Sequence, residues 1–315
     1  MRILITGITG FVGRHLWALL RPPEYSVFGT SYPDKPLPSE PDVFFLDMRW
    51  EREVFDVVKD VKPEAVFHLA ALSNVGFSWE RRRETLETNL MGTLYLLEAV
   101  KKFTPRARLL FISSSDVYGF GGGGGSSGPR VLSERDGYHI ANPYAFSKLA
   151  SEILSDFYVR IEELDIVITR SFPHTGPGQG PDFVCSDWAR QIARIERGGV
   201  EPVIRVGNLA SERDYSDVRD TVRAYALLMQ KGRRGEIYNV CSGRGISLRK
   251  ILDRLLSFSK VKIKVEVDRQ KLRKTDIPVL VGDNSKLRVD TGWKPQILFE
   301  QTLRDLLEDW RNRII

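Results

Sequence analysis

The amino-acid sequence predicts an α/β fold, in which a doubly wound, mostly parallel β-sheet carries helices on both faces and a smaller C-terminal lobe follows. In the first 170 residues, short apolar segments typical of buried strands alternate with helical patterns. Such alternation indicates parallel strands joined by right-handed crossovers. After residue 170 the pattern becomes irregular, with clusters of proline and glycine. We therefore expect a sheet-forming unit over residues 1–170 and a ligand-binding lobe over most of residues 171–315.

The order of the elements follows from the spacing of apolar residues. In the first unit, strands are expected at residues 2–6, 26–30, 43–46, 65–69, 108–113 and 165–170, with helices between them. In the C-terminal part, helices are expected near 183–197 and 217–231, and a short strand at 237–241. We expect the segment 217–241 to return to the sheet of the first unit.

Three glycines separate the first strand from the first helix. An apolar run at residues 2–6 is followed by Gly7, Gly10 and Gly13. Glycines at this spacing let the backbone turn sharply, approach a pyrophosphate and pack a helix against a strand, while the helix N-terminus offers free N–H groups to phosphates. Any tight turn uses glycine, but these glycines follow a strand and precede a helix, as dinucleotide binding requires. We assign to a dinucleotide cofactor the contacts Gly7, Gly10, Phe11, Val12 and Gly13.

A second informative segment is a helix start at Asn142 and Pro143. A side-chain oxygen at the N-cap and a proline at the first helical position both favour it. Tyr144 and Lys148 then lie on the same helix face, because they are four residues apart. A cation beside a phenol favours the phenolate, so we expect Lys148 to lower the Tyr144 pKa from its usual value of about 10. The pair predicts a general acid or base at Tyr144, although such a pair also occurs by chance in many helices.

The strand at 108–113 leads into three serines, Ser113, Ser114 and Ser115. In an open parallel sheet, ligands bind at the carboxyl ends of the strands, so these hydroxyls are expected near the cofactor. We assign Ser114 a hydrogen bond to a substrate carbonyl oxygen. Ser113 and Ser115 are interpreted as residues that end the strand in a turn.

Taken together, these three features resemble a known family. The pattern TGxxGxxG at residues 6–13, the serine at 114 and YxxxK at 144–148 are similar to the extended short-chain dehydrogenase/reductases. The resemblance covers nearly the whole chain. It implies a Rossmann-type fold, a nicotinamide cofactor, and Ser114, Tyr144 and Lys148 as catalytic residues.

Later segments narrow the resemblance to enzymes of nucleotide sugars. Residues 170–179 and 206–220 resemble that branch of the family. The C-terminal segments 272–276, 282–287 and 292–295 are similar to those of GDP-mannose dehydratases and GDP-4-keto-6-deoxymannose reductases. The resemblance implies that Arg213 and Arg273 bind the substrate diphosphate, with His174 and Asp276 as further substrate contacts. For each arginine, the alternative to diphosphate binding is an ordinary surface salt bridge.

The end of the second strand bears on the choice of nicotinamide cofactor. An acidic side chain there would bind the ribose 2′-hydroxyl of NAD and repel the 2′-phosphate of NADP. No Asp or Glu occupies residues 28–32, and Arg14 and Lys35 are close in sequence. NADP(H) is therefore favoured over NAD(H). Further cofactor contacts are assigned to Thr30, Ser31, Asp47, Met48, Leu69, Ala70, Ala71, Tyr144 and Lys148. The resemblance gives Asp47 a contact with adenine, and an ordinary strand-end carboxylate is the competing interpretation.

The resemblance implies reduction of the C4 ketone of a GDP-4-keto-6-deoxyhexose. Ser114 and Tyr144 would hold the ketone oxygen, Tyr144 would protonate the alkoxide, and Lys148 would also hold the nicotinamide ribose. A GDP-mannose 4,6-dehydratase or a nucleotide-sugar 4-epimerase is the alternative. Asp116 stands where such dehydratases usually carry Glu, but related reductases can also carry an acid there.

Two further observations rank these functions. The glycine turn reads Gly10-Phe11-Val12-Gly13, and GDP-mannose dehydratases typically have a Gly-Gln-Asp-Gly sequence there, so the reductase leads. A non-catalytic dinucleotide-sensing protein is the third hypothesis. It is disfavoured because a sensor needs the glycine turn but not the serine, tyrosine and lysine.

The composition agrees with an enzyme of this kind. The chain of 315 residues is long enough for a large core. It has no stretch of about 18 apolar residues and no charged leader before its first strand, so neither a membrane span nor a secretory signal is expected. The net charge is +6, but Lys and Arg are spread among carboxylates, so no nucleic-acid partner is expected. Two cysteines suggest no disulfide framework; we assign no metal ligands and expect a cytoplasmic protein.

A helix expected near 79–102 bears on assembly. It carries Leu86, Leu90, Leu94 and Leu97 along one stripe and other apolar side chains on other faces. A helix that is apolar on more than one side needs a second burial partner. The resemblance favours a homodimer through this helix, and core packing alone is the alternative.

Residues 121–128 are all glycine or serine. Such a segment is a flexible coil with little intrinsic structural preference. We interpret it as a slack connection between the serine strand and the tyrosine helix and assign it no function.

Overall fold

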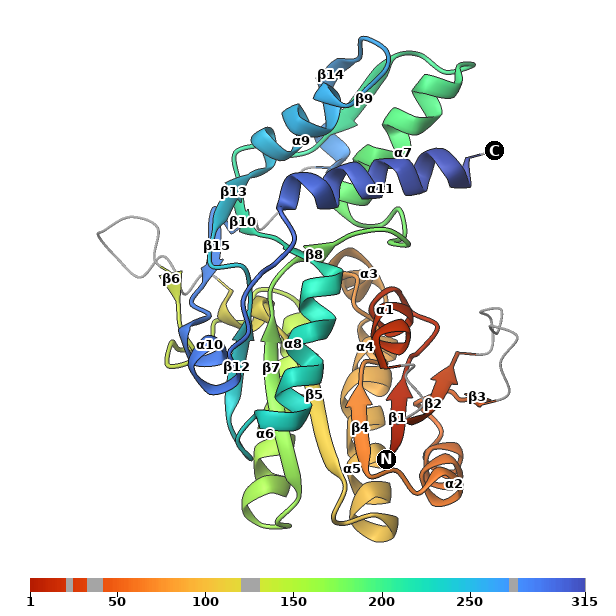
Figure 1. The fold of residues 1–315 in the computed structure, drawn as a ribbon, viewed down its shortest axis with the longest axis vertical. Helices are drawn as coiled ribbons and strands as arrows, with labels where there is room; N and C mark the ends of the chain where they lie inside the picture. Colours follow the sequence, from red (N-terminus) through yellow and green to blue (C-terminus); the bar gives the residue numbers. More distant parts are fainter. Residues whose placement is uncertain (21–24, 33–41, 120–130, 272–276, 315) are drawn as a thin grey trace.

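The computed structural model describes residues 1–20, 25–32, 42–119, 131–271 and 277–314. The described residues form a seven-stranded parallel sheet in the order β12-β7-β5-β4-β1-β2-β3 (Figure 1). The strand order reverses beside β1, which is where ligands bind in sheets of this kind. The strands of this sheet are β1 (Arg2–Thr6), β2 (Ser26–Ser31), β3 (Val43–Phe45), β4 (Ala65–His68), β5 (Arg108–Ser114), β7 (Asp165–Ser171) and β12 (Ile237–Val240).

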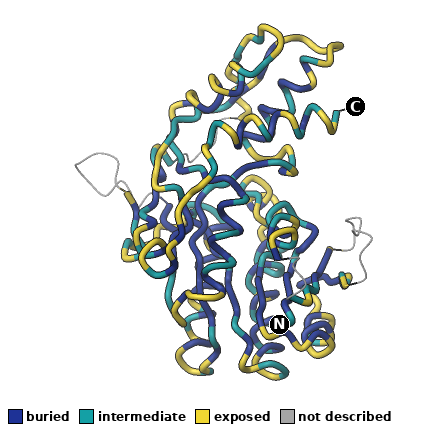
Figure 2. The backbone as a smooth tube through the Cα atoms, viewed as in Figure 1, coloured by how far each residue is buried: buried dark blue, intermediate teal, exposed yellow. Residues whose placement is uncertain are grey.

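Helices cover both faces of the sheet. On one face, α2 (Glu51–Val61), α5 (Gly92–Phe103) and α6 (Pro143–Arg160) enclose a core that includes Leu109. On the other face, α1 (Phe11–Leu20), α8 (Val218–Lys231) and α10 (Ser285–Thr291) enclose a core that includes Leu110. Neighbouring residues of β5 thus enter opposite cores, because successive side chains of a strand point to opposite faces. Figure 2 shows the strands between these helix layers as buried over most of their length.

A smaller lobe lies at the carboxyl edge of this sheet (Figure 1). Its core is enclosed by α7 (Val184–Arg197), α9 (Leu248–Ser257) and α11 (Phe299–Arg313). Short strands form a four-stranded sheet in the order β13-β10-β15-β6 and the pairs β11-β8 and β14-β9. These strands are β6 (Val131–Leu132), β8 (His174–Thr175), β9 (Val203–Val206), β10 (Glu212–Asp214), β11 (Ser216–Asp217), β13 (Gly245–Ser247), β14 (Lys264–Val267) and β15 (Val279–Gly282).

Side chains from the first turn of α1 connect the two parts. The Phe11 ring stacks on His174 with the ring centroids 6.2 Å apart. His15 Nε2 lies 2.8 Å from the Pro177 carbonyl oxygen. From the lobe, Asp309 of α11 accepts a hydrogen bond of 2.9 Å from the Gly178 N–H. The segment after β7 is therefore held between the start of α1 and the last helix.

The predicted parallel sheet is confirmed. Each predicted strand is present, with its ends displaced by one residue at most. The predicted helices near 183–197 and 217–231 correspond to α7 and α8. Strand β12 pairs in parallel with β7, so the chain passes back into the main sheet after the irregular segment.

The prediction of one continuous helix over residues 79–102 is wrong. The structure has α3 (Val75–Glu80), α4 (Arg82–Leu86), a π-helical turn η1 (Glu87–Met91) and α5. Arg81 interrupts the helix with φ −118° and ψ 50°. In the π-helical turn, Asn89 accepts a hydrogen bond of 2.8 Å from the Leu72 N–H and donates one of 2.9 Å to the Ser147 hydroxyl. The wider turn aims this buried amide at partners that a regular α-helix would not align.

The buried face of this segment also differs from the predicted leucine stripe. Of the predicted stripe, Leu97 is buried, while Leu86, Leu90 and Leu94 are only partly buried. Thr85, Asn89, Thr93 and Val100 are also buried. Two further short helices are η2 (Ser115–Tyr118) and η4 (Arg269–Lys271). Among the helices formed by the described residues, none has the length and apolar character that crossing a membrane requires.

Candidate active site

The glycine turn lies at the carboxyl end of β1. Gly7 has a φ of 72°, in the region that favours glycine. A Cβ at Gly13 would lie 2.4 Å from the Gly7 carbonyl oxygen, so the start of α1 packs directly on the turn. The Gly7 N–H donates a hydrogen bond of 3.1 Å to Thr30 Oγ1. Phe11 and Val12 form the first turn of α1, whose N-terminus presents N–H groups to this edge of the sheet.

The predicted contacts at the end of β2 lie beside this turn. Thr30 and Ser31 are both buried. Ser31 Oγ lies 2.9 Å from Thr9 Oγ1, and Arg14 Nε donates a hydrogen bond of 3.0 Å to the Thr9 carbonyl. These polar groups hold the glycine turn against β2 and form a rim where a dinucleotide ribose would lie.

An arginine that the sequence analysis missed lies at the same rim. Arg49 forms an ion pair of 2.6 Å with Asp47 and donates a hydrogen bond of 3.3 Å to the Tyr32 hydroxyl. Burial alone would raise the pKa of Asp47, but the hydrogen bonds and charge of Arg49 lower it overall. Asp47 follows β3 and Tyr32 follows β2, so pairing of these strands brings the arginine to the end of β2. Its position two residues after a strand-end aspartate was the only available sequence signal.

The predicted contacts after β4 face the glycine turn. A Cβ at Gly7 would lie 3.1 Å from the Ala70 backbone, and the Ala70 N–H donates a hydrogen bond of 3.1 Å to Thr6 Oγ1. Leu69 and Ala71 flank it and are partly buried. Met48, by contrast, packs its side chain into the core under α2 and α5.

Tyr144 lies in the first turn of α6, as predicted. Asn142 Oδ1 accepts a hydrogen bond of 2.8 Å from the Ala145 N–H, and Pro143 opens the helix. The Tyr144 side chain is buried, and its hydroxyl is hydrogen-bonded to the side chain of Ser114 at the end of β5. Asp116 follows in η2, where its N–H donates a hydrogen bond of 3.2 Å to Ser114 Oγ. The serine and tyrosine hydroxyls thus meet at the carboxyl edge of the sheet.

The predicted lowering of the Tyr144 pKa is wrong for this structure. Burial raises the pKa of Tyr144, the Asp116 carboxylate raises it further, and the hydrogen bond with Ser114 opposes them. The Lys148 ammonium instead donates a hydrogen bond of 2.7 Å to the Ile112 carbonyl. It also lies 5.2 Å from the centroid of the Phe111 ring. Tyr144 therefore holds its proton firmly, which suits a proton donor.

Lys148 occupies a buried position beside a neutral histidine. Burial lowers the pKa of Lys148 to about 8, while the Glu152 carboxylate opposes this change. His68 at the end of β4 lies between Thr6 Oγ1, at 2.8 Å from Nδ1, and Thr93 Oγ1, at 3.0 Å from Nε2. Burial and the Lys148 charge lower the pKa of His68 to about 3. The histidine is therefore neutral, and Lys148 is the titrating cation of the site near neutral pH.

Two predicted substrate contacts lie in the C-terminal lobe. His174 in β8 contacts Phe11 beside the glycine turn, and its Nδ1 lies 2.9 Å from the Phe172 carbonyl oxygen. Burial lowers the pKa of His174. Arg213 in β10 donates a hydrogen bond of 2.8 Å to the Glu212 carbonyl. The predicted contacts Arg273 and Asp276 lie outside the described residues, as does the segment 121–128.

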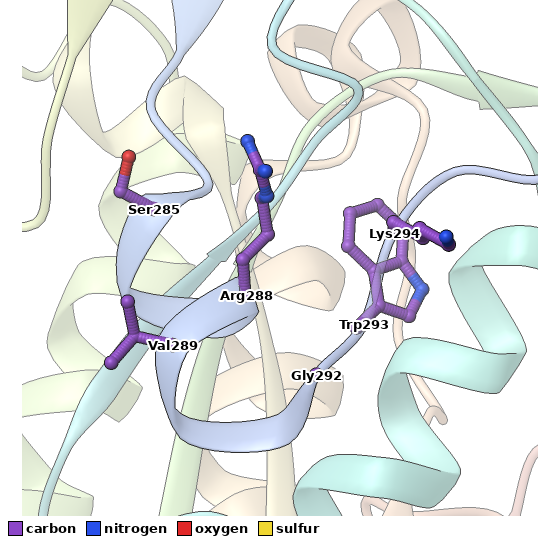
Figure 3. A pocket seen from close by; sticks show the side chains of 6 residues that line it. All are labelled: Ser285, Arg288, Val289, Gly292, Trp293 and Lys294. Atoms are coloured by element: carbon purple, nitrogen blue, oxygen red, sulfur yellow. The ribbon is translucent and has the colours of Figure 1, made fainter.

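Neither a metal cluster nor a hollow marks the candidate site among the described residues. Within them, no group of three or more His, Cys, Asp or Glu side chains could hold a metal ion. A hollow of about 470 Å³ beside α10 is lined by Ser285, Arg288, Val289, Gly292, Trp293 and Lys294 (Figure 3). It contains none of the predicted site residues. A second hollow, of about 890 Å³ and lined in part by Tyr215, Ser242 and Lys294, also contains none of them. The strand ends, and not these two hollows, therefore locate the candidate site.

Similarity to known proteins agrees with this geometry. A model of the GDP-mannose 4,6 dehydratase family matches residues 4–306, nearly the whole chain. The chain belongs to the GDP-mannose 4,6-dehydratase family. This family assignment confirms the predicted resemblance to short-chain dehydrogenase/reductases that act on nucleotide sugars.

Within this GDP-mannose 4,6-dehydratase family, the chain is similar in sequence to proteins named for two different activities. The chain is 35% identical over 313 residues to the GDP-6-deoxy-D-mannose reductase of Pseudomonas aeruginosa, covering 99% of this chain and 98% of the relative. It is 28% identical to GDP-mannose 4,6 dehydratase 2 of Arabidopsis thaliana, covering 97% and 86%. A solved structure of RMD from Pseudomonas aeruginosa complexed with NADPH matches with a TM-score of 0.86 and 34% identity, covering 99% of both chains. The Rossmann-type fold is thereby confirmed.

Proposed function

We propose that this protein reduces the C4 ketone of a GDP-4-keto-6-deoxyhexose, with NADPH as the hydride donor. The observation that carries the proposal is the meeting of Ser114 and Tyr144 at the end of β5, with Lys148 one helical turn further along α6. This cluster and the glycine turn lie at the same edge of the sheet. The higher identity to a reductase than to a dehydratase supports the same activity.

The residues present fit a nicotinamide dinucleotide. The positive φ of Gly7 and the close packing at Gly13 create a turn that larger residues would fill. This turn and the start of α1 would hold the cofactor diphosphate. Lys148 would hold the nicotinamide ribose. When bound, the cofactor supplies the hydride that reduces the ketone carbon.

The protein's own residues bind the ketone oxygen and supply a proton. Ser114 and Tyr144 would each donate a hydrogen bond to that oxygen, which polarises the carbonyl group. Because its pKa is raised, Tyr144 holds its proton until negative charge develops on the oxygen, and then transfers it. A lysine ammonium has three N–H donors, so it can keep its bond to Ile112 while it contacts a ligand.

Dehydration is the second candidate reaction, and Asp116 is the residue that favours it. The charge of the Asp116 carboxylate raises the pKa of the Tyr144 phenol, so this carboxylate lies near the reacting groups. A 4,6-dehydratase or a 4-epimerase returns its hydride to the product and leaves the cofactor unchanged. A reductase consumes one NADPH for each sugar. The cofactor balance therefore separates the two classes.

For the cofactor, we propose NADP(H) over NAD(H). The rim at the end of β2 contains Arg14 and Arg49 and no free carboxylate among the described residues, because Asp47 is paired with Arg49. An arginine at this position can accommodate the ribose 2′-phosphate. Thr30, Ser31 and Tyr32 supply hydroxyl groups beside it.

For the substrate, we propose that Arg213 and Arg273 bind the diphosphate of a GDP-sugar. His174 is supported as a sugar-side contact, because its ring lies against Phe11 beside the glycine turn. Asp276 is the fourth proposed substrate contact. Cationic side chains are needed there because the diphosphate is an anion that carries the sugar into the site.

We also propose a homodimer, formed through the helical segment 82–103 together with α6. The outer side of α6 exposes Phe146, Ile153 and Phe157, at 50%, 58% and 49%, and Met91 is exposed on the neighbouring segment. These residues form an apolar surface on adjacent helices, and such surfaces mark contact sites. A cytoplasmic location is proposed with it, consistent with two buried, unpaired cysteines.

Incubation of the purified protein with three substrates tests the proposal. The expected result is NADPH oxidation with a GDP-4-keto-6-deoxyhexose, and none with GDP-mannose or UDP-sugars. Conversion of GDP-mannose without net cofactor oxidation would instead identify a dehydratase. Interconversion of UDP-sugars would identify an epimerase, and cofactor binding without any turnover would identify a sensor.

A further inference from the structure

A buried ion pair lies directly behind the candidate catalytic residues. Arg170 in β7 donates hydrogen bonds to both carboxylate oxygens of Glu152, with distances of 2.9 to 3.2 Å. The two side chains are 5% and 4% exposed. The Arg170 guanidinium also lies 4.8 Å from the centroid of the Tyr118 ring, whose hydroxyl donates to Asn239 at 2.7 Å. Charges buried this deeply are costly unless their partners are well placed.

The same pair contacts the end of β5. Ser113 donates a hydrogen bond of 2.5 Å to Glu152 Oε1. In the β5–β7 ladder, Ser113 lies opposite Arg170, so serine, glutamate and arginine close a compact triangle. The interpretation of Ser113 as a residue that only ends its strand is therefore incomplete.

Three successive residues of β5 thus dock on one face of α6. Ile112 accepts the hydrogen bond of Lys148, Ser113 donates to Glu152, and Ser114 bonds to Tyr144. The three helix residues are spaced by four, which places them in a row along the helix. Movement of Ser113 would displace both of its neighbours, and these are the residues that hold the lysine and the tyrosine.

We propose that Glu152 and Arg170 form a positioning pair, which fixes the end of β5 against α6 and sets the arrangement of charges beside Lys148. This inference rests on the proposed reductase function for its activity readout. Neither residue is assigned a contact with substrate or cofactor.

The charges around Lys148 define the direction of the effect. Glu152 on its own helix favours the ammonium form, burial opposes it, and neutral His68 on β4 adds no charge. Arg170 on β7 forms an ion pair of 2.9 Å with Glu152 and so opposes the charge of that carboxylate. Removing the glutamate therefore disfavours the ammonium, whereas removing the arginine favours it.

The pH dependence of kcat/KM tests the pair, because its basic limb should move in opposite directions in two variants. The variants are Glu152→Gln and Arg170→Gln, and the readout is the basic limb of kcat/KM for keto-sugar reduction. We expect this limb to move by about 1 unit to lower pH in Glu152→Gln and by about 1 unit to higher pH in Arg170→Gln. A purely structural role would lower stability and activity in both variants and leave the limb in place.

A matched control comes from another partly buried ion pair. Glu196 bonds to Arg311 at 2.7 Å between α7 and α11, in the core of the C-terminal lobe. Glu196→Gln makes the same chemical change there and should leave the limb unmoved. If either single variant fails to fold, the double variant Glu152→Leu with Arg170→Met leaves no unpaired buried charge. Its limb is expected near that of the parent protein, between those of the single variants, because the lost carboxylate and the lost guanidinium act in opposite directions. A displacement as large as that of a single variant would contradict the pair.

The pH dependence of NADPH binding, followed by fluorescence, is measured in the same variants. Opposite shifts in the binding profile without any keto-sugar turnover would overturn the proposed reductase and support the positioning pair. Normal turnover with unshifted profiles, in activity and in binding, would overturn the positioning pair and leave the reductase intact.

Discussion

The Lys148 ammonium donates a hydrogen bond of 2.7 Å to the backbone carbonyl of Ile112, two residues before Ser114. This bond joins the helix that carries the tyrosine to the strand that carries the serine. It holds the lysine in a buried position, where its pKa falls to about 8. In the proposed mechanism the lysine therefore has two tasks, which are to align the strand and the helix of the candidate site and to supply a charge that is sensitive to pH.

Removal of the Tyr144 hydroxyl is expected to abolish most turnover. Tyr144→Phe loses the proton donor, and general acid catalysis contributes roughly 100- to 10,000-fold. We expect kcat to fall by at least about 100-fold while NADPH still binds. Steady-state kinetics and a binding titration measure these two effects. Tyr95→Phe, on α5, is the matched control, and near-normal kcat in Tyr144→Phe would refute the assigned proton donor.

Activity is expected to decline as the pH rises through about 8. In the proposed mechanism the ammonium form of Lys148 is the active one. Its pKa of about 8 lies below the usual lysine value, so the charge is lost near pH 8. The profile of kcat/KM reports groups of the free enzyme and measures this limb. An arginine keeps its charge at every accessible pH, so Lys148→Arg should remove the limb even if activity is reduced. A limb that persists near pH 8 in Lys148→Arg belongs to another group.

Arg49 is expected to set the preference for NADPH over NADH. A hydrogen bond to a charged group is worth about 1.5–3 kcal/mol, so Arg49→Ala should weaken NADPH binding by roughly 10- to 100-fold. NADH binding should change little, because NADH lacks the 2′-phosphate. Arg52→Ala is the control, since that side chain is 95% exposed on α2. Equal losses for both cofactors would show that Arg49 does not contact the phosphate.

The cap of α6 is expected to contribute to stability. Asn142→Ala removes the hydrogen bond to the Ala145 N–H and should lower the free energy of unfolding by about 1 kcal/mol. Asn142→Asp keeps a capping oxygen and should be close to the parent protein. Chemical denaturation measures both variants. Equal stability of Asn142→Ala and the parent would contradict the role of the cap.

The apolar surface on α6 is expected to form the dimer contact. Phe157→Glu places a charge in that surface and should convert dimers into monomers, as measured by sedimentation velocity. Val289→Glu is the control, because Val289 is 82% exposed on α10, away from this surface. A parent protein that sediments as a monomer, or a Phe157→Glu variant that remains dimeric, would contradict the proposed dimer.

Features that depend on neighbours in the sequence were predictable. The glycine turn, the Asn142 cap and the spacing of Tyr144 and Lys148 are local, so their positions follow from a few adjacent residues. The strands followed from apolar runs, because both faces of the main sheet are buried beneath helices.

Features that depend on distant pairing were not predictable. Arg49 reaches the end of β2 only because β3 pairs with it. The π-helical turn contains Asn89, whose hydrogen bonds to Leu72 and Ser147 join it to distant segments and are not revealed by any helical pattern. The direction of the Tyr144 pKa depends on burial and on Asp116, so spacing to Lys148 alone gave the wrong sign. The partnership of Glu152 with Arg170 likewise joins a helix to a strand 18 residues away.

Transfer of a labelled hydride decides whether the protein reduces the C4 ketone of the sugar. The protein is supplied with NADPH deuterated at the transferable C4 position and with a GDP-4-keto-6-deoxyhexose, and the product is examined by mass spectrometry and NMR. We expect one deuterium at C4 of the sugar, one NADP⁺ formed per product, and loss of this transfer in Tyr144→Phe. A sugar product without deuterium at C4, or formed without NADP⁺, would contradict the proposed reduction.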